Sequence, residues 1–75
     1  MIDDKKFFEE QVEWISYRIR VLNTIEAKLK EMRTLAEYAR DQQPDREDIA
    51  LIQDKINKLH REIEALDQEH HKIVH

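Results

Sequence analysis

The chain has 75 residues, of which 40% are charged and 40% hydrophobic, and its formal net charge is −4. It contains no glycine, no cysteine and one proline, which excludes disulfide bridges and thiol chemistry and favours a single small helical unit. Basic residues are interleaved with acidic ones, which argues against nucleic acid as a partner. The uncharged runs are far shorter than the roughly 20 apolar residues that span a bilayer, and the charged start is not a signal peptide. We expect a cytoplasmic protein without a membrane segment.

A first helix is predicted from about residue 3 to residue 41. Asp3 is its expected N-cap, and Ile2 and Phe7 occupy the two positions of a hydrophobic staple. One apolar stripe with helical spacing follows the helix, through Phe8, Val12, Ile15, Ile19, Leu22, Ile25, Leu29, Met32, Ala36 and Ala39. Two successive steps of three, on either side of Leu22, interrupt the heptad repeat. An uneven supercoil or a change of neighbouring helix is expected there.

The first half of this helix carries more apolar surface than one helix-to-helix seam needs. We interpret this region as an interaction surface formed by Phe7, Phe8, Trp14, Ile15, Tyr17 and Val21. It is covered by a dimer core or the end of the second helix, by a different protein, or by a membrane surface. The neighbouring acids Glu9, Glu10 and Glu13 oppose binding to anionic lipid.

The predicted turn extends from about residue 42 to residue 45. Pro44 disfavours helical geometry at Gln43, and Asp45 can cap a second helix that has Asp48 in its first turn. Such a short link favours an antiparallel hairpin. Because the second helix is shorter than the first, the N-terminal turns of the first helix are expected to extend beyond its end.

The second helix, over residues of about 45–73, carries a clear heptad repeat. Its helix-to-helix seam is predicted at Ile49, Ile52, Ile56, Leu59, Ile63, Leu66 and Ile73, with His70 in the remaining position. The fold class is therefore all-α: one domain over 1–75 that forms an antiparallel, coiled-coil-like two-helix hairpin. A chain of this size buries little surface alone, so two copies are expected to pair into a four-helix bundle with the first helices near its centre.

The sequence offers little chemistry. His71 and His75 stand four apart, and Asp67 and His70 have the carboxylate-x-x-His spacing of some metal sites in helical bundles. The inward positions, however, are held by Ile and Leu, so no metal or cofactor is predicted. The one serine, Ser16, has no histidine near it in sequence, and there is no Gly-rich phosphate loop. We assign no catalytic residue and expect no enzyme.

Part of the chain, about half of it, resembles a known family. Residues in the second helix look like the second helix of the UVR helical hairpin of nucleotide-excision-repair subunits and some chaperone adaptors, and Met32 and Ala36 look like its first. The second-helix residues are Glu47, Ala50, Ile52, Asp54, Ile56 and Leu59. The family's Phe-Glu-x-Ala-Ala is replaced here by Arg-Glu-Asp-Ile-Ala, and its Leu-Arg-Asp by Ile-Gln-Asp. The chain is also similar in size to short regulatory hairpins of Gram-positive sporulation control, but lacks their Ser-Gln-Glu-Leu-Asp motif. Both resemblances imply that such hairpins act by binding proteins.

Two functions follow as hypotheses. The first is a small regulatory or adaptor hairpin, not an enzyme, that docks on another protein through a hydrophobic helix surface. The alternative is a purely structural, self-assembling homodimeric four-helix bundle with no other client. They differ in what covers the aromatic side chains of the first helix.

Overall fold

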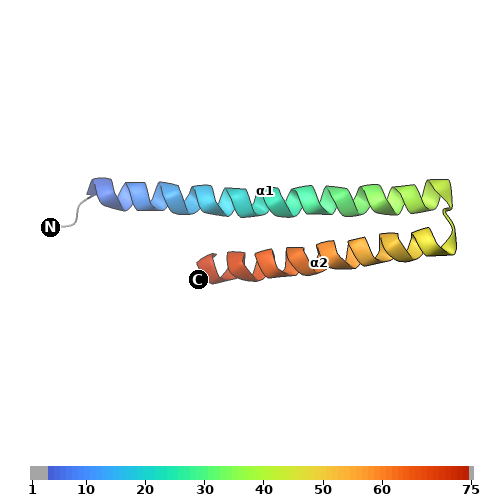
Figure 1. Ribbon diagram of the computed structural model, residues 1–75. Helices are drawn as coiled ribbons and strands as arrows, with labels where there is room; N and C mark the ends of the chain where they lie inside the picture. The colour runs from blue at the N-terminus through green and yellow to red at the C-terminus, as the bar shows by residue number, and fades with distance from the viewer. Residues whose placement is uncertain (1–3, 75) are drawn as a thin grey trace.

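The protein is an antiparallel pair of helices. The computed structural model describes the backbone of residues 4–74 and the side chains of residues 4–69. Helix α1 spans Asp4–Gln42 and helix α2 spans Arg46–Val74, and together they form a rod of 67 × 18 × 12 Å (Figure 1). The predicted all-α hairpin is confirmed, with no strand in the described part of the chain. The expected N-cap Asp3, and Ile2, which is expected to form the hydrophobic staple with Phe7, lie outside the described residues.

The turn is set by three consecutive residues. Gln43 has a φ of 44°, a left-handed conformation that ends α1, and Pro44 follows it. Asp45 then caps α2, because its Oδ1 accepts a hydrogen bond of 2.9 Å from the backbone N–H of Asp48. Its own carbonyl accepts the first helical bond, also 2.9 Å, from the N–H of Ile49. The cap that the sequence predicts is therefore present, and it satisfies a first-turn amide that would otherwise lack a partner.

The side of α1 that contacts α2 follows a regular heptad repeat. We call it the inner face, and it consists of Arg18, Val21, Ile25, Lys28, Met32, Leu35 and Ala39, all buried or half-buried. Val21 is the most buried of them, at 6% exposure. Polar contacts also cross the pair: Lys28 Nζ lies 3.2 Å from Glu62 Oε1, and Tyr17 is hydrogen-bonded to Glu69. These contacts fix the register of the two helices.

The single stripe predicted for the first helix does not lie on one side of α1. Its first half faces away from α2, and its second half alternates between half-buried positions, such as Ile25 and Met32, and exposed ones, such as Leu29. Ile19, Leu22 and Leu29 are all exposed. They belong to a second heptad row, which we call the outer face: Phe8, Val12, Ile15, Ile19, Leu22, Glu26 and Leu29. Each outer position directly follows an inner position in sequence, so the two faces point about 100° apart. The irregular spacing near Leu22 arises because the predicted stripe passes from one row to the other.

The predicted seam of α2 lies mostly against α1. Leu59 is buried at 7% exposure, and Ile52, Ile56, Ile63 and Leu66 are half-buried. Ile49 differs: it is 47% exposed, because it sits in the first turn of α2, where the chain is still leaving the loop. The side chains of Ile73 and His70 lie outside the described residues.

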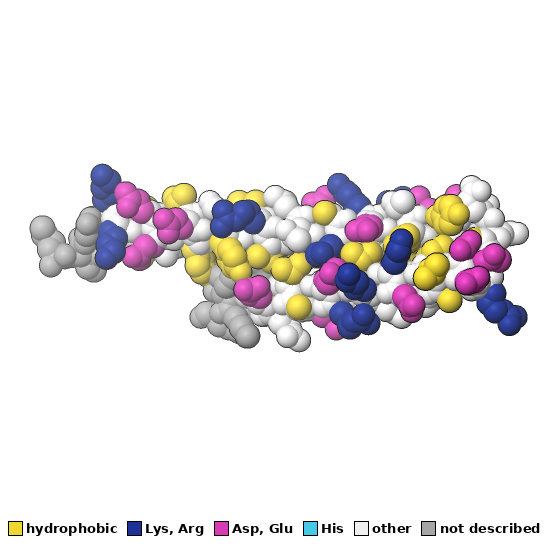
Figure 2. Space-filling model, in the orientation of Figure 1, with side chains coloured by type: hydrophobic (Ala, Val, Ile, Leu, Met, Phe, Trp, Pro, Cys, Tyr) yellow, Lys and Arg dark blue, Asp and Glu magenta, His cyan; other side chains and the backbone are white. Residues whose placement is uncertain are grey.

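The hairpin buries too little to form a core of its own. Val21 and Leu59 are the only buried hydrophobic residues among the described side chains. The accessible surface is 6548 Å², whereas a compact folded protein of this mass exposes about 4900 Å². Hydrophobic side chains are visible over the surface, including a group on α1 beside the end of α2 (Figure 2). About 1600 Å² of surface per chain is therefore in excess of what a compact monomer shows.

The burial of α2 predicts a contrast between two leucines. Leu59→Ala should lower the free energy of unfolding by about 2–5 kcal/mol, because it opens a cavity between the helices. Leu51→Ala should change it by roughly 0.5 kcal/mol or less, since Leu51 is exposed. Thermal and urea unfolding followed by circular dichroism measures both. Equal losses in the two variants would mean that Leu51 is covered in solution.

Candidate interaction surface

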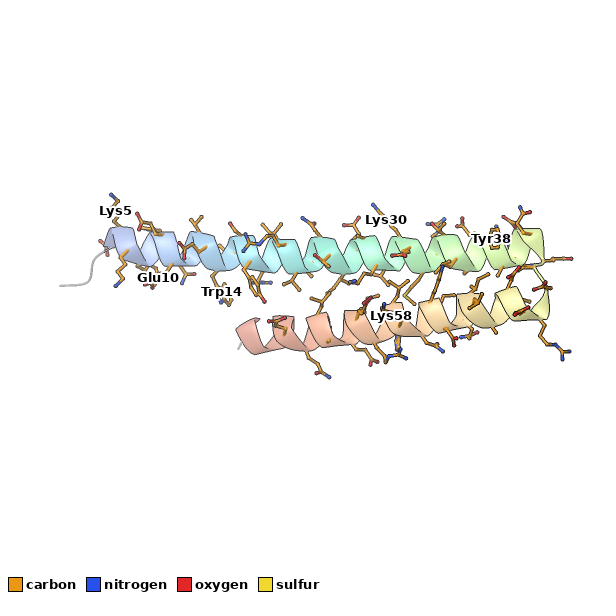
Figure 3. All side chains as sticks on the ribbon, viewed as in Figure 1. Lys5, Glu10, Trp14, Lys30, Tyr38 and Lys58 are labelled. Carbon is orange, nitrogen blue, oxygen red and sulfur yellow. The ribbon has the colours of Figure 1, made fainter. Side chains whose placement is uncertain are left out.

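The N-terminal turns of α1, up to Trp14, extend beyond the end of α2, and we call them the overhang (Figures 1 and 3). Phe7 and Phe8 are both exposed there, with ring centroids 6.0 Å apart and planes at 70°, an edge-to-face pair. Trp14 points to the side of α1 on which α2 lies, just past its end (Figure 3). The overhang thus presents three large aromatic residues that α2 is too short to cover.

Trp14 is partly shielded by its own helix. The guanidinium carbon of Arg18 lies 5.5 Å from the ring centroid of Trp14, within the range of a cation–π contact. Trp14 nevertheless remains 37% exposed. A partner that covers the exposed part of this residue would gain apolar area, and the Arg18 contact already helps to order the ring.

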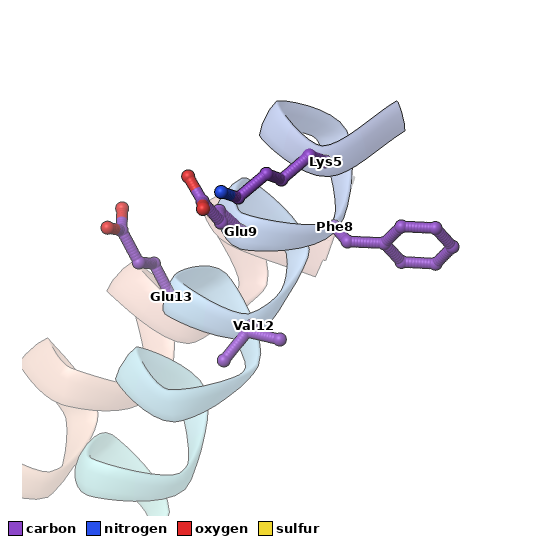
Figure 4. Close-up of a pocket in the computed structure, with 5 residues that line it drawn as sticks. All are labelled: Lys5, Phe8, Glu9, Val12 and Glu13. Atoms are coloured by element: carbon purple, nitrogen blue, oxygen red, sulfur yellow. The ribbon is translucent and has the colours of Figure 1, made fainter. Parts of the chain in front are cut away.

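A shallow hollow lies on the overhang beside these aromatic residues. It has a volume of about 490 Å³ and is lined by Lys5, Phe8, Glu9, Val12 and Glu13. Phe8 and Val12 project from one side of the helix, and the three charged side chains project from another (Figure 4). All five residues come from successive turns of one helix, so the hollow is open and does not enclose a small molecule. It suits the side of another helix better than a cofactor.

The outer face continues this surface along α1. Its six hydrophobic members, Phe8, Val12, Ile15, Ile19, Leu22 and Leu29, are between 46% and 65% exposed. Glu26 interrupts them and is paired with Lys30, whose Nζ lies 3.3 Å from Glu26 Oε1. The next position of the row is Arg33, so the hydrophobic part ends at Leu29. A hydrophobic strip of this length on a solvent-exposed helix is typical of a helix that has a partner.

The structure separates the six residues predicted for the interaction surface. Phe7, Phe8, Trp14 and Ile15 are exposed. Val21 is buried, because it packs on α2 inside the hairpin.

Tyr17 is half-buried and is held by its hydrogen bond to Glu69. The sequence interpretation missed Val12, Ile19, Leu22 and Leu29 as exposed residues, because it assigned them to the seam with α2. Two heptad rows one residue apart were the signal that would have found them.

The described residues do not gather metal-ligating side chains. Within residues 4–69, no three His, Cys, Asp or Glu side chains gather closely enough to hold a metal ion. His71 and His75 and the side chain of His70 lie outside that part of the chain. Neither helix, over the residues that the structure describes, is long and apolar enough to cross a membrane. The cytoplasmic location stays a prediction.

The contact between Tyr17 and Glu69 predicts a pH dependence. The hydrogen bond to the Glu69 carboxylate raises the pKa of Tyr17 above its ordinary value of 10.0. The folded hairpin therefore holds the phenol proton more tightly than the unfolded chain does. This stabilisation is complete below about pH 10 and is lost as the pH rises through the raised pKa.

The Tyr17→Phe variant has no phenol proton and therefore lacks this pH-dependent stabilisation. The difference in unfolding free energy between the wild type and this variant should be smaller at about pH 11 than at about pH 8. Urea unfolding of both proteins at the two pH values measures it. A difference that does not change with pH would show that the contact is absent in solution.

Compared with known proteins, the chain matches no protein-family model, no curated protein sequence and no solved structure. The resemblance to the UVR hairpin therefore rests on the quoted residues alone and does not show membership of that family.

Proposed function

We propose that this protein is a small, non-enzymatic interaction module, a regulatory or adaptor hairpin that binds another protein through the hydrophobic surface of α1. The overhang is the part that contacts the client. Its aromatic side chains Phe7, Phe8 and Trp14 supply the anchoring area, and the acidic residues around them select against anionic partners.

One observation carries the proposal: α1 exposes a long hydrophobic strip although α2 is already packed against it. The exposed side chains follow the a and d spacing of a helix that pairs with another helix. The hairpin also buries only two hydrophobic side chains in the described part of the chain. A partner would supply the burial that the hairpin lacks.

A second candidate function is supported by the same strip. Two hairpins that pair through their outer faces would form a homodimeric four-helix bundle with the first helices at its centre. Such a bundle could be purely structural and need no other client. The two candidates differ at Trp14, which lies on the inner side of the overhang and not on the outer face.

A capture experiment separates them. Immobilised wild-type chain should retain a defined client from native lysate, and Trp14→Asp should retain it at least about ten-fold less, since loss of an aromatic anchor costs 2 kcal/mol or more. Ala27→Asp is the matched control: it adds the same charge to α1 at an exposed position away from both faces. Retained proteins are quantified by mass spectrometry. If wild type and Trp14→Asp retain the same proteins in equal amounts, or wild type retains only its own copies, the adaptor function fails and the structural alternative stands.

Self-assembly has its own test. Purified wild type should sediment as a dimer at micromolar concentration, and Ile19→Asp should weaken association roughly 100-fold or more, because each copy would bury a carboxylate. Ala27→Asp should sediment as the wild type does. A monomeric wild type, or equal weakening in both variants, would contradict pairing through the outer face.

A further inference from the structure

We propose that the outer face of α1 binds the outer face of a second copy in antiparallel orientation, about a two-fold axis that crosses the face between Ile19 and Leu22. This inference rests on the self-assembly proposed above and adds to it the partner's orientation and register. In this arrangement Ile19 packs against Leu22 of the second copy, and Val12 packs against Leu29 of the second copy.

The amount of exposed surface fits a second copy. Each chain shows about 1600 Å² more surface than a compact protein of its mass, and a stable interface buries about 800 Å² on each partner. The outer face supplies six hydrophobic side chains, each about half exposed. An isologous contact covers this strip on both copies at once, because the same residues serve on each side.

Glu26 argues against a parallel pair. In parallel helices each position of the heptad row meets its own equivalent, so Glu26 would face Glu26 of the second copy inside a hydrophobic seam. In the antiparallel arrangement Glu26 lies opposite Ile15 of the second copy instead. Its carboxylate keeps Lys30 as a partner at 3.3 Å, and both groups reach the edge of the seam.

The flanking charges fit the same arrangement. Acidic and basic residues are equally numerous in each half of α1, but two positions beside the outer face carry opposite charges, Glu9 near the start of α1 and Lys30 beyond its middle. Antiparallel pairing places Glu9 of each copy beside Lys30 of the other. Glu9 and Lys30 both flank the outer face on the side away from α2, and Lys30 points away from α2 in Figure 3. Two equivalent contacts between Glu9 and Lys30 of the other copy would form.

Charge also selects the register. Moving the axis one heptad step, to lie between Ile15 and Ile19, keeps as many purely hydrophobic layers. It would, however, place Phe8 against Glu26 and Leu29 against Lys5, and it would leave Lys30 without an acidic neighbour on the second copy. With the axis between Ile19 and Leu22, Phe8 instead lies against Arg33, whose guanidinium can stack on the ring.

The arrangement is compatible with the hairpin and with a client. Because α2 lies about 100° around α1 from the outer face, it does not obstruct the second copy. Phe7 and Trp14 are on the inner row, so the dimer leaves them open. A bundle built in this way leaves Phe7 and Trp14 of the overhang free to bind another protein, while Phe8 is used in the dimer.

Disulfide cross-linking tests orientation and register. The chain has no cysteine, so introduced thiols give no background. Copies carrying Ile19→Cys and copies carrying Leu22→Cys are mixed in equal amounts and oxidised under dimer-forming conditions. Random pairing would make the mixed disulfide about half of the linked product, and the proposed arrangement should raise it above half. A mixture of Ile15→Cys and Ile19→Cys copies is the matched register control and should not exceed that share.

Each of the other outcomes contradicts one part of the proposal: the orientation, the register or the interface itself. If each variant links preferentially to itself, the pair is parallel; if the control mixture links preferentially, the register is shifted. If neither mixture links although sedimentation shows a dimer, the outer face is not the interface. A protein that sediments as a monomer instead removes the self-assembly on which this inference rests, so the two failures are distinguishable.

A charge reversal gives a second, independent readout. Glu9→Lys should weaken dimerisation roughly ten-fold, because two Lys–Lys contacts replace two Glu–Lys contacts. Glu10→Lys makes the same charge change one residue further on, on the side of α1 opposite the outer face, and should leave the dissociation constant within about two-fold. The difference between the dissociation constants of the two variants should become smaller at high salt, because salt screens exposed charges. Equal effects of the two variants would contradict the proposed pairing of Glu9 with Lys30.

Discussion

The contact between α1 and α2 along the inner face is the interaction on which the rest of the structure depends. Val21 and Leu59 are its most buried members, and the ion pair between Lys28 and Glu62 crosses it. Two helices can bury only one side of each other, however far the seam extends. Every other hydrophobic residue of α1 must therefore stay exposed or find a further partner.

The position of the exposed strip follows from helix geometry. Inner and outer rows are offset by one residue, which turns the side chains by about 100°. A smaller turn would have merged both rows into one wide core stripe, and a larger one would have placed the outer row opposite α2. At about 100° the outer row is clear of α2 and presents a second hydrophobic row with the same heptad spacing. The aromatic overhang adds a second exposed region, because α1 has 39 residues and α2 only 29.

Charge gives these surfaces a direction. Most of the charged residues lie on solvated sides of the helices and form ordinary contacts one turn apart, such as Arg33 with Glu37 at 2.8 Å. Acidic and basic residues are balanced along α1, but Glu9 and Lys30 place opposite charges beside the two ends of the outer face. Pairs of this kind contribute little to stability. In the proposed dimer, contacts such as Glu9 with Lys30 would favour one orientation over others of similar hydrophobic burial.

The sequence by itself determined the class of fold, the turn and the cap. Absence of glycine, the single Pro44 and the acidic residue after it leave one place for a break, and the structure shows the Asp45 cap at that place. These are local effects, which depend on residues a few positions apart. The heptad repeat of the second helix was equally readable, since only one row of large hydrophobic residues is present there.

Only the tertiary structure decided which side of α1 meets α2. That helix carries two hydrophobic rows, and the residue spacing alone predicted one continuous stripe that passes from one row to the other after Leu22. The choice depends on the register of α2, which is fixed by contacts between residues distant in sequence, such as Tyr17 with Glu69. That register buries Val21 and exposes Ile19 and Leu29. A periodic pattern shows that a helix has a hydrophobic side, but the neighbour that covers it is a property of the packed pair.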